Sequence, residues 1–327
     1  MIRYVTAAVM LRLFSAGPLM RGMYRRLGNV VGARQRLGQG LPGSYVERAL
    51  RFKRLCEKHE AIGNGMRLLE IGTGWVHWDA TFLRLFYDVQ ATLFDVWDNR
   101  QLEAFKRYFG QLEAHLEGEI ELDATTARRV RELLRAIAAV STFDELYRLL
   151  GFRYVVQPDG SLQRFEDGAF DLIFSFNVLE HVQADILPQF TRDMARLLRP
   201  GGYAIHQIDL GDHLAYYDPI VSPKNYLRYS DTAWRRRYEN EVQYFNRVQR
   251  PEWLHLFQSA GLVLLEEQRV SADIGAIAVD RKYAHLDRQD LECTALTVVL
   301  KKAGSSCSGG HGLPTVPLAG QETGQQR

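Results

Sequence analysis

Two acidic residues and a pair of glycines form the chemically most informative pattern in this sequence. Glu70 ends an apolar run and is followed by Gly72 and Gly74, which one residue separates. Glycines at such a place let the backbone turn sharply and approach a ligand closely. Asp95 ends a second apolar run, 23 residues after Gly72, where a carboxylate can accept hydrogen bonds from both hydroxyls of a ribose. The pattern predicts a nucleoside site, although a dinucleotide site needs the same turn.

Histidines and carboxylates after two later apolar runs could handle a proton. His181 follows the run at 170–176, and Asp209 and His213 follow the run at 203–208. Open α/β sheets bind ligands at the carboxyl ends of their strands, and histidine titrates near neutral pH, which suits a general base. We therefore predict His213 and Asp209 as catalytic residues, whereas His181 has the alternative role of a packed side chain.

Residues 211–250 are polar, aromatic and irregular, and we interpret them as a lid insertion. Aromatic and hydrogen-bonding groups of this density suit a polar organic substrate. The alternative is that the aromatic rings pack the lid onto the domain. The predicted substrate contacts are Tyr216, Tyr217, Tyr229 and Arg247.

The elements that must position these residues alternate between strand and helix. Strands are expected near residues 67–71, 91–95, 153–157, 170–176, 203–208, 262–266 and 294–300, and helices near 126–137, 143–150, 185–198 and 252–259. Such alternation predicts a mostly parallel sheet covered on both faces. We expect Arg199-Pro200-Gly201-Gly202 to end a helix before the next strand, because proline cannot continue a helix.

The ordered set of motifs resembles class I S-adenosylmethionine-dependent methyltransferases, in particular the broad group with a common Rossmann-like methyltransferase domain. The resemblance lies in Leu-Leu-Glu-Ile-Gly-Thr-Gly, Phe-Asp-Val, Phe-Glu-Asp-Gly-Ala-Phe-Asp-Leu-Ile, Asn-Val-Leu-Glu-His-Val and Arg-Leu-Leu-Arg-Pro-Gly-Gly. It covers residues 66–210 well and 250–302 in outline. It implies a mostly parallel seven-stranded α/β sheet with helices on both faces, and S-adenosyl-L-methionine as cofactor.

The resemblance also implies roles for single residues. Glu70 and the turn Gly72-Thr73-Gly74 would hold the methionine end of the cofactor, and Asp95 would bind its ribose. Asp159 would lie beside the adenine amine, and Asn177 would meet the methionine portion. From the residues alone, Asp159 equally fits a Pro-Asp-Gly turn, while Asp95 and Asn177 could be helix caps. The third glycine that the family often carries is replaced by Val76.

The domain organisation follows from composition and motif positions. We expect a basic helical N-terminal arm or cap at residues 1–62 and a methyltransferase domain at 63–302. That domain would carry a helical insertion at 100–150 and the lid at 211–250. The Gly-, Ser-, Pro- and Gln-rich tail at 303–327 is expected to be disordered.

Charge is distributed unevenly along the chain, although the net charge is only +2. Residues 1–60 hold twelve Lys and Arg against three Glu, a balance of +9 that leaves −7 for the rest. A basic amphipathic helix of this kind covers the domain as a cap or lies on an anionic membrane, where a lipid-linked acceptor would be within reach. A nucleic acid partner is disfavoured, because no RNA-binding signature accompanies the low net charge.

Three cysteines without metal-type spacing favour a reducing cytoplasm over a disulfide framework. No apolar run reaches the roughly 18–20 residues that span a bilayer, and no signal-peptide pattern begins the chain. We therefore expect a cytoplasmic enzyme, with the inner membrane face as an additional location.

The pattern as a whole predicts methyl transfer to a small-molecule, glycan-like or lipid-linked acceptor at oxygen. Two other functions compete with this prediction. A nicotinamide-dependent oxidoreductase would share the glycine turn and the acidic residue. It would also be expected to carry a third glycine, which this sequence lacks. A non-catalytic cofactor-binding scaffold would share the whole fold, because fold alone does not determine function.

Overall fold

The apolar runs that end at Glu70 and Asp95 are neighbouring parallel strands of one seven-stranded sheet. The computed structural model describes residues 1–116 and 122–304. The strands are β1 (Arg67–Ile71), β2 (Gln90–Asp95), β3 (Phe152–Val156), β4 (Phe170–Phe176), β5 (Leu198–Asp209), β6 (Leu262–Ser271) and β7 (Cys293–Lys302). Their order across the sheet is β3-β2-β1-β4-β5-β7-β6.

Strand direction fits the predicted Rossmann-like methyltransferase fold. The pairs from β3 through β5 are parallel, whereas β7 is antiparallel to both β5 and β6. The mostly parallel seven-stranded α/β sheet expected from the sequence is therefore confirmed. Because the parallel strands run in one direction, their carboxyl ends meet along a single edge, and Glu70, Asp95, Phe176 and Asp209 all lie there.

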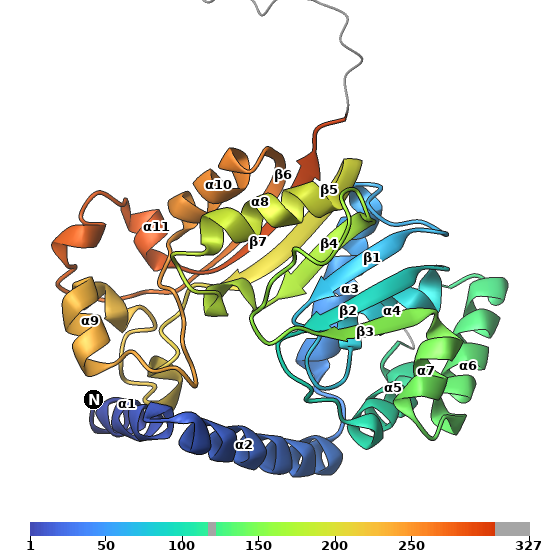
Figure 1. Cartoon of the computed structure of the whole chain (residues 1–327), viewed down its shortest axis with the longest axis horizontal. Helices are drawn as coiled ribbons and strands as arrows, with labels where there is room; N and C mark the ends of the chain where they lie inside the picture. The colour runs from blue at the N-terminus through green and yellow to red at the C-terminus, as the bar shows by residue number, and fades with distance from the viewer. Residues whose placement is uncertain (117–121, 305–327) are drawn as a thin grey trace, which may run out of the picture.

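Helices cover both faces of the sheet (Figure 1). Successive residues of a strand face opposite sides, so Leu68 joins one hydrophobic core and Leu69 the other. The helices are α1 (Ile2–Ser15), α2 (Pro18–Gln39), α3 (Gly43–Lys58), α4 (Trp78–Phe86), α5 (Leu102–Leu116), α6 (Ala124–Ala139), α7 (Phe143–Leu150), α8 (Leu187–Leu197), α9 (Asp231–Arg237), α10 (Arg250–Ser259) and α11 (Arg288–Glu292). Helices α3 to α7 pack in the first core, and α8 and α10 pack in the second.

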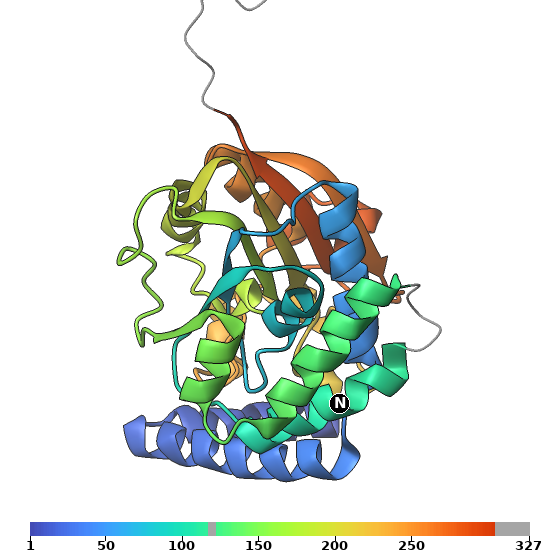
Figure 2. The same ribbon diagram turned by 90° about the vertical axis from the view of Figure 1, so that its right-hand side faces the viewer.

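The stretch expected as a helical insertion forms α5, α6 and α7, which gather beside the edge strand β3 (Figure 2). Local capping explains two of their boundaries. The Asp123 carboxylate accepts backbone N–H groups at the start of α6, and Thr142 does the same for α7. Gly151 then ends α7 in a left-handed conformation with φ 73°.

The Arg-Pro-Gly-Gly segment differs from the expectation. Helix α8 already ends at Leu197, and β5 begins at Leu198, so the four residues lie inside the strand rather than before it. They form an irregularity in which Phe170 pairs with Leu198 but Leu172 pairs with Tyr203. Gly201 has φ 78°, which suits the extra residues of a bulge. The prediction that this segment precedes the strand was therefore wrong.

The basic N-terminal segment divides into two parts. Helix α3 packs its apolar side, including Phe52, into the core against Phe174 of β4. Helices α1 and α2 instead lie end to end, in one line, across the carboxyl edge of the sheet (Figure 1). Across the described residues, no helix is both long and apolar enough to cross a membrane.

A third hydrophobic core, here called the lid core, joins three distant parts of the chain. Helix α1 contributes Tyr4, Ala8 and Leu11, and the segment 211–250 contributes Tyr226 and Trp234 among others. The connection between β6 and β7 adds residues such as Tyr283. The sequence indicated the lid but not its partnership with α1 or with the β6–β7 connection.

The division into residues 1–62, 63–302 and 303–327 stays a prediction. Within the first range, α3 packs as part of the sheet's core. Most of the tail expected to be disordered, residues 305–327, lies outside the described residues.

Lys224 of the lid generates a prediction about pH. Its Nζ is buried and donates hydrogen bonds to Gln249 Oε1 and the Cys293 carbonyl oxygen, at 2.8 Å each. Burial lowers the pKa of Lys224 to about 7, whereas an unfolded lysine titrates near ~10.4. Between these values the unfolded chain binds a proton that the folded chain does not, so this lysine makes stability rise with pH.

Lys224→Met should therefore flatten the rise of the unfolding free energy between about pH 7 and 9.5, by up to about 1.4 kcal/mol per pH unit. Denaturant titrations at stepped pH measure the slope. Lys282→Met, at an exposed position, is the matched control. Equal slopes for wild type and Lys224→Met would contradict the assignment.

Candidate functional site

The glycine turn after β1 is held against two neighbouring segments. Gly72 and Gly74 have φ of 73° and 65°, a region that strongly favours glycine. The N–H groups of Gly72 and Thr73 donate to the Phe94 carbonyl oxygen at 2.8 and 3.3 Å. A Cβ on Gly72 would lie 2.4 Å from a methyl carbon of Val178. The turn is therefore pinched between β2 and the segment that follows β4.

Glu70 is buried beneath this turn, and its carboxylate supports the next helix. Its Oε2 accepts hydrogen bonds from Thr73 Oγ1 at 3.1 Å and from the Ala80 N–H at 3.3 Å. Burial, followed by the nearby Asp79 carboxylate, raises the pKa of Glu70 well above its usual range. A cationic ligand group beside Glu70 would offset this cost.

Arg48 and Asp79 complete the polar group around Glu70, and neither was predicted from the sequence. Arg48 of α3 makes a bidentate ion pair with Asp79, with contacts of 3.2 and 2.9 Å. Arg48 stands within an amphipathic helix and Asp79 within an apolar one, so neither had a motif to reveal it. The group places a guanidinium beside two carboxylates, and this is complementary to a zwitterionic ligand.

Asp95 closes the other side of the glycine turn. Its carboxylate accepts hydrogen bonds from the Gly74 N–H at 3.1 Å and the Val96 N–H at 2.8 Å. Burial raises the pKa of Asp95, and the backbone hydrogen bonds oppose that effect. Glu70 and Asp95 thus brace the same turn from opposite sides.

Three adjoining cavities surround this turn, and Gly72 and Val178 line all of them. The inner cavity, about 260 Å³, lies between Arg48, Glu70 and Asp79. The side cavity, about 380 Å³, is lined by Asp95, Phe94, Ile186 and Phe190. The outer cavity, about 590 Å³, is lined by Asp95 and by residues of α2 and the lid.

The seven residues predicted to bind the cofactor are all brought to this cavity system. Glu70, Thr73 and Gly74 line the inner cavity, and Asp95 lines the outer and side cavities. Asn177, with φ 55°, lines the inner and outer cavities. Asp159 lines the side cavity and accepts the Ser161 N–H at 2.9 Å. Glu70 and Asp95 therefore face different compartments that meet at Gly72.

Trp75 stands between the inner and outer cavities without separating Glu70 from the turn. Its indole N–H donates to Asn29 Oδ1 at 3.2 Å, and the Arg36 guanidinium lies 3.7 Å from its ring centroid. Both partners belong to α2. Helix α2 therefore covers the carboxyl edge of the sheet and packs against the Trp75 ring.

The predicted catalytic residues lie on the lid side of the outer cavity. His213 lines the cavity, and its Nε2 is 3.6 Å from Asp209 Oδ2. Asp209 also accepts a hydrogen bond from the Tyr216 hydroxyl. His181 lines the same cavity and lies close to His213, with ring centroids 5.1 Å apart. The structure thus brings together the residues that follow β4 and β5.

Only part of the predicted substrate set reaches the cavity. Tyr216 and Tyr217 line it. Tyr229 instead packs on Tyr238 in the lid core, with ring centroids 4.9 Å apart. Arg247 is buried, pairs with Asp231 and donates to the Tyr229 carbonyl oxygen. The polar groups of Tyr229 and Arg247 are thus satisfied within the lid, and their role as substrate contacts stays a prediction.

A family model identifies the type of domain. A family model described as a methyltransferase domain matches residues 46–267, more than half of the chain. A comparison with curated proteins gave no match.

Several solved structures are similar to this chain. The cyclase SpnF is 14% identical with a TM-score of 0.43, covering 78% of this chain and 81% of that chain. A protein from Galdieria sulphuraria that carries the provisional name sarcosine dimethylglycine methyltransferase is 12% identical with a TM-score of 0.46. The match covers 79% of this chain and 86% of that chain. A SAM-dependent methyltransferase from Methanosarcina mazei is 15% identical with a TM-score of 0.39, covering 76% and 97%.

The pinched turn yields a prediction about stability. Gly72→Ala should destabilise the fold by the ~1–2 kcal/mol of a left-handed non-glycine residue and by a further ~1–3 kcal/mol of overpacking against Val178. Gly65→Ala, with φ 79° and no atom near the added Cβ, should show only the first cost.

Adding Val178→Ala should recover part of the Gly72→Ala loss, because it removes the methyl carbons nearest the new Cβ. Chemical denaturation of the four chains of this double-mutant cycle measures the coupling. Strictly additive effects would show that the close approach to Val178 does not constrain the turn.

Proposed function

The chain belongs to the methyltransferase domain family, and from this premise we propose that it methylates a hydroxyl oxygen of a small, glycan-like or lipid-linked acceptor in the outer cavity. The protein is an S-adenosyl-L-methionine-dependent methyltransferase of class I, and the nicotinamide alternative is set aside. The observation that carries the proposal is the meeting of three cavities at Gly72, with proton-accepting groups on the far wall.

The cofactor fits the cavity system by charge and shape. Arg48 would receive its carboxylate, while Glu70 and Asp79 would receive its ammonium group, which offsets their burial. Asp95 would accept the ribose hydroxyls. The apolar side cavity, with Phe94, would hold the adenine, whose amine would lie near Asp159.

The acceptor would enter the outer cavity beside Asn177. When bound, S-adenosyl-L-methionine supplies a methyl group on a sulfonium, and transfer to oxygen leaves the carbon–sulfur electron pair on sulfur. The protein's part is to align the acceptor oxygen and exclude water. The Asp209 and His213 pair, with His213 Nε2 3.6 Å from Asp209 Oδ2, would take the proton that the hydroxyl loses. Tyr216 and Tyr217 would contact the rest of the acceptor.

The outer face of α1 supports a membrane-borne acceptor. While Tyr4, Ala8 and Leu11 pack into the lid core, the opposite side of the helix exposes large apolar side chains. They are Ile2, Val5, Val9, Met10 and Leu13, which are 42–85% exposed. A helix that is apolar on both sides has one face unused by the fold.

Helix α2 continues this exposed face. Its apolar residues recur at spacings of three, four and seven residues, which places them on one side. They are Leu19, Met23, Leu27, Val30 and Leu37, which are 41–77% exposed. The polar side of α2 faces the enzyme instead, through contacts such as Tyr24 with Gln243 and Asn29 with Trp75.

The positive charge of this face favours an anionic surface as its binding partner. Residues 1–46 contain no Asp or Glu, and residues 1–40 contain seven arginines. Arg3, Arg26 and Arg34 are exposed and form no ion pair with a carboxylate of the described residues. We infer that the α1–α2 face, defined by the apolar residues named above, lies on an anionic lipid bilayer. The acceptor cavity, which Arg21 and Arg25 of α2 line, would then open beside the bilayer.

The enzymatic proposal predicts labelled methyl transfer from S-adenosyl-L-methionine into an extract fraction, with lipid fractions included. Asp95→Asn should weaken cofactor binding by about 10–100-fold, because a hydrogen bond to a charged group contributes ~1.5–3 kcal/mol. Asp144→Asn, at an exposed site on α7, is the control. Calorimetry with S-adenosyl-L-homocysteine measures the affinity. Unchanged affinity of Asp95→Asn, or cofactor binding without transfer to any fraction, would contradict the proposal.

The membrane proposal predicts co-sedimentation with vesicles containing phosphatidylglycerol but not with vesicles of phosphatidylcholine alone, and release by salt. Leu19→Glu with Leu27→Glu should reduce partitioning at least about 10-fold, because each leucine loses ~1.5–3 kcal/mol of burial. Ile220→Glu, an exposed apolar position in the lid, is the control. Equal binding by all variants would contradict the proposal. A variant-dependent change from dimer to monomer in light scattering would instead identify a second copy of the chain as the partner.

A further inference from the structure

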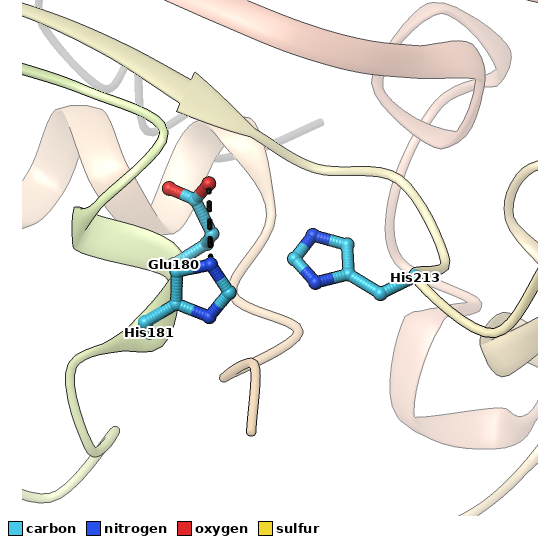
Figure 3. Close-up of side chains that lie close together, drawn as sticks. All are labelled: Glu180, His181 and His213. Carbon is cyan, nitrogen blue, oxygen red and sulfur yellow. Dashed lines mark ion pairs between the residues drawn. The ribbon is translucent and has the colours of Figure 1, made fainter. Parts of the chain in front are cut away.

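Three potential metal ligands lie close together (Figure 3), and two of them, His181 and His213, line the outer cavity. Glu180 and His181 come from the turn after β4, and His213 comes from the segment after β5. One ligand atom from each lies within 4.8 Å of the others. Bonds of ~2.0–2.3 Å to a common ion bring its ligand atoms within about 4.6 Å of one another, so these side chains would close slightly around the ion.

The hydrogen bonding of His181 leaves a ring nitrogen free for a metal. Its Nδ1 lies 2.6 Å from the Tyr244 carbonyl oxygen. A carbonyl only accepts, so Nδ1 must carry the proton. In the neutral ring Nε2 then holds a lone pair, and this atom lies 4.0 Å from Glu180 Oε1. A histidine oriented by a backbone carbonyl in this way is typical of a metal ligand.

Glu180 supplies a second, independent indication of a ligand. It is 2% exposed, and neither of its carboxylate oxygens has a hydrogen-bond partner within the described part of the chain. The Nε2 atom of His213 is likewise buried without a partner. Buried polar atoms without hydrogen-bond partners are costly, and a bound ion would give Glu180 and His213 a common partner.

The groups around the cluster are acidic rather than basic. Asp209 lies 3.6 Å from His213, so two carboxylates, Glu180 and Asp209, adjoin the cluster. Among residues 1–116 and 122–304, neither carboxylate pairs with an arginine or a lysine. A divalent ion bound here would offset the charge of both carboxylates.

The backbone holds these groups in place. The Asn246 N–H donates to the Glu180 carbonyl oxygen at 2.8 Å, and Asn246 Nδ2 donates to the Leu179 carbonyl oxygen at 2.9 Å. The His213 ring packs against Phe245, with centroids 4.6 Å apart. Because these contacts hold the backbone in place, closure around an ion would involve the ligand side chains rather than the backbone.

We propose that Glu180, His181 and His213 bind one divalent ion of a first-row transition metal such as Zn²⁺, Co²⁺ or Mn²⁺. Two imidazoles and one carboxylate suit these ions, whereas Mg²⁺ and Ca²⁺ prefer oxygen ligands. Three protein ligands leave coordination positions open, and His181 and His213 line the outer cavity. An oxygen of the acceptor would occupy an open position.

This role for the ion rests on the proposed O-methylation, although binding of the ion does not. With the ion in place His213 is a ligand, and Asp209 is the group left to take the proton of the acceptor. The ion would both orient the acceptor oxygen and stabilise its negative charge.

Calorimetric titration of the full chain, without an affinity tag and after chelator treatment, tests the site with Zn²⁺, Co²⁺, Mn²⁺ and Mg²⁺. We expect one ion per chain, and for Co²⁺ a visible absorption band. Glu180→Gln and His213→Asn should each weaken binding by more than about 10–100-fold, the loss that even outer-shell changes cause. Glu132→Gln and His255→Asn change exposed residues and should bind like wild type.

Thermal unfolding keeps the test decisive if a variant is altered in stability. The ion should raise the Tm of wild type and of the two controls but not of Glu180→Gln. Without metal, Glu180→Gln should be at least as stable as wild type, because it removes a buried carboxylate without a partner. Equal metal affinity across all variants, no binding at millimolar ion, or a preference for Mg²⁺ would overturn the assignment.

Cofactor binding measured on the same samples separates this proposal from the proposed function. A chain that binds S-adenosyl-L-homocysteine but no metal retains the methyltransferase site and refutes the metal site. A chain that binds the metal but transfers no methyl group refutes the O-methylation and retains the metal site.

Discussion

The close approach of Gly72 to Val178 is the constraint on which the site depends. Because no Cβ fits between them, β1 and the segment after β4 can meet, and three cavities open around their junction. Two buried carboxylates then fix the turn, since Glu70 binds the start of α4 and Asp95 binds the Gly74 N–H. Both carboxylates bear a burial cost that a cationic or hydroxyl-bearing ligand would offset.

The acceptor side is built on a different principle. The lid core joins α1, residues 211–250 and the β6–β7 connection, and it buries aromatic rings such as Trp234. This packing fixes His213 opposite Glu180 and His181 while α2 covers the remaining side. The same arrangement turns the apolar outer side of α1 and α2 to solvent, which puts the proposed acceptor cavity beside the surface that we propose to bind lipid.

Local patterns were sufficient for the sheet and for the turn. The apolar runs gave the positions of the strands, and β4 and α7 agree with the expectation to the residue, since period and capping are encoded locally. The prediction for the Arg-Pro-Gly-Gly segment was wrong, because proline and glycine indicate a turn equally well before a strand and within a bulge. Arg48 and Asp79 carried no motif, since their pairing joins two helices that are distant in sequence.

The sequence by itself therefore determined the family, the cofactor and the ordered acids of the glycine turn, because each depends on residues close together in the chain. Only the tertiary structure decided which polar residues share a cavity. It separated Tyr216 and Tyr217 from Tyr229 and Arg247, and it placed α2 over the site. Such choices depend on packing between distant segments, and no local period or spacing records that packing.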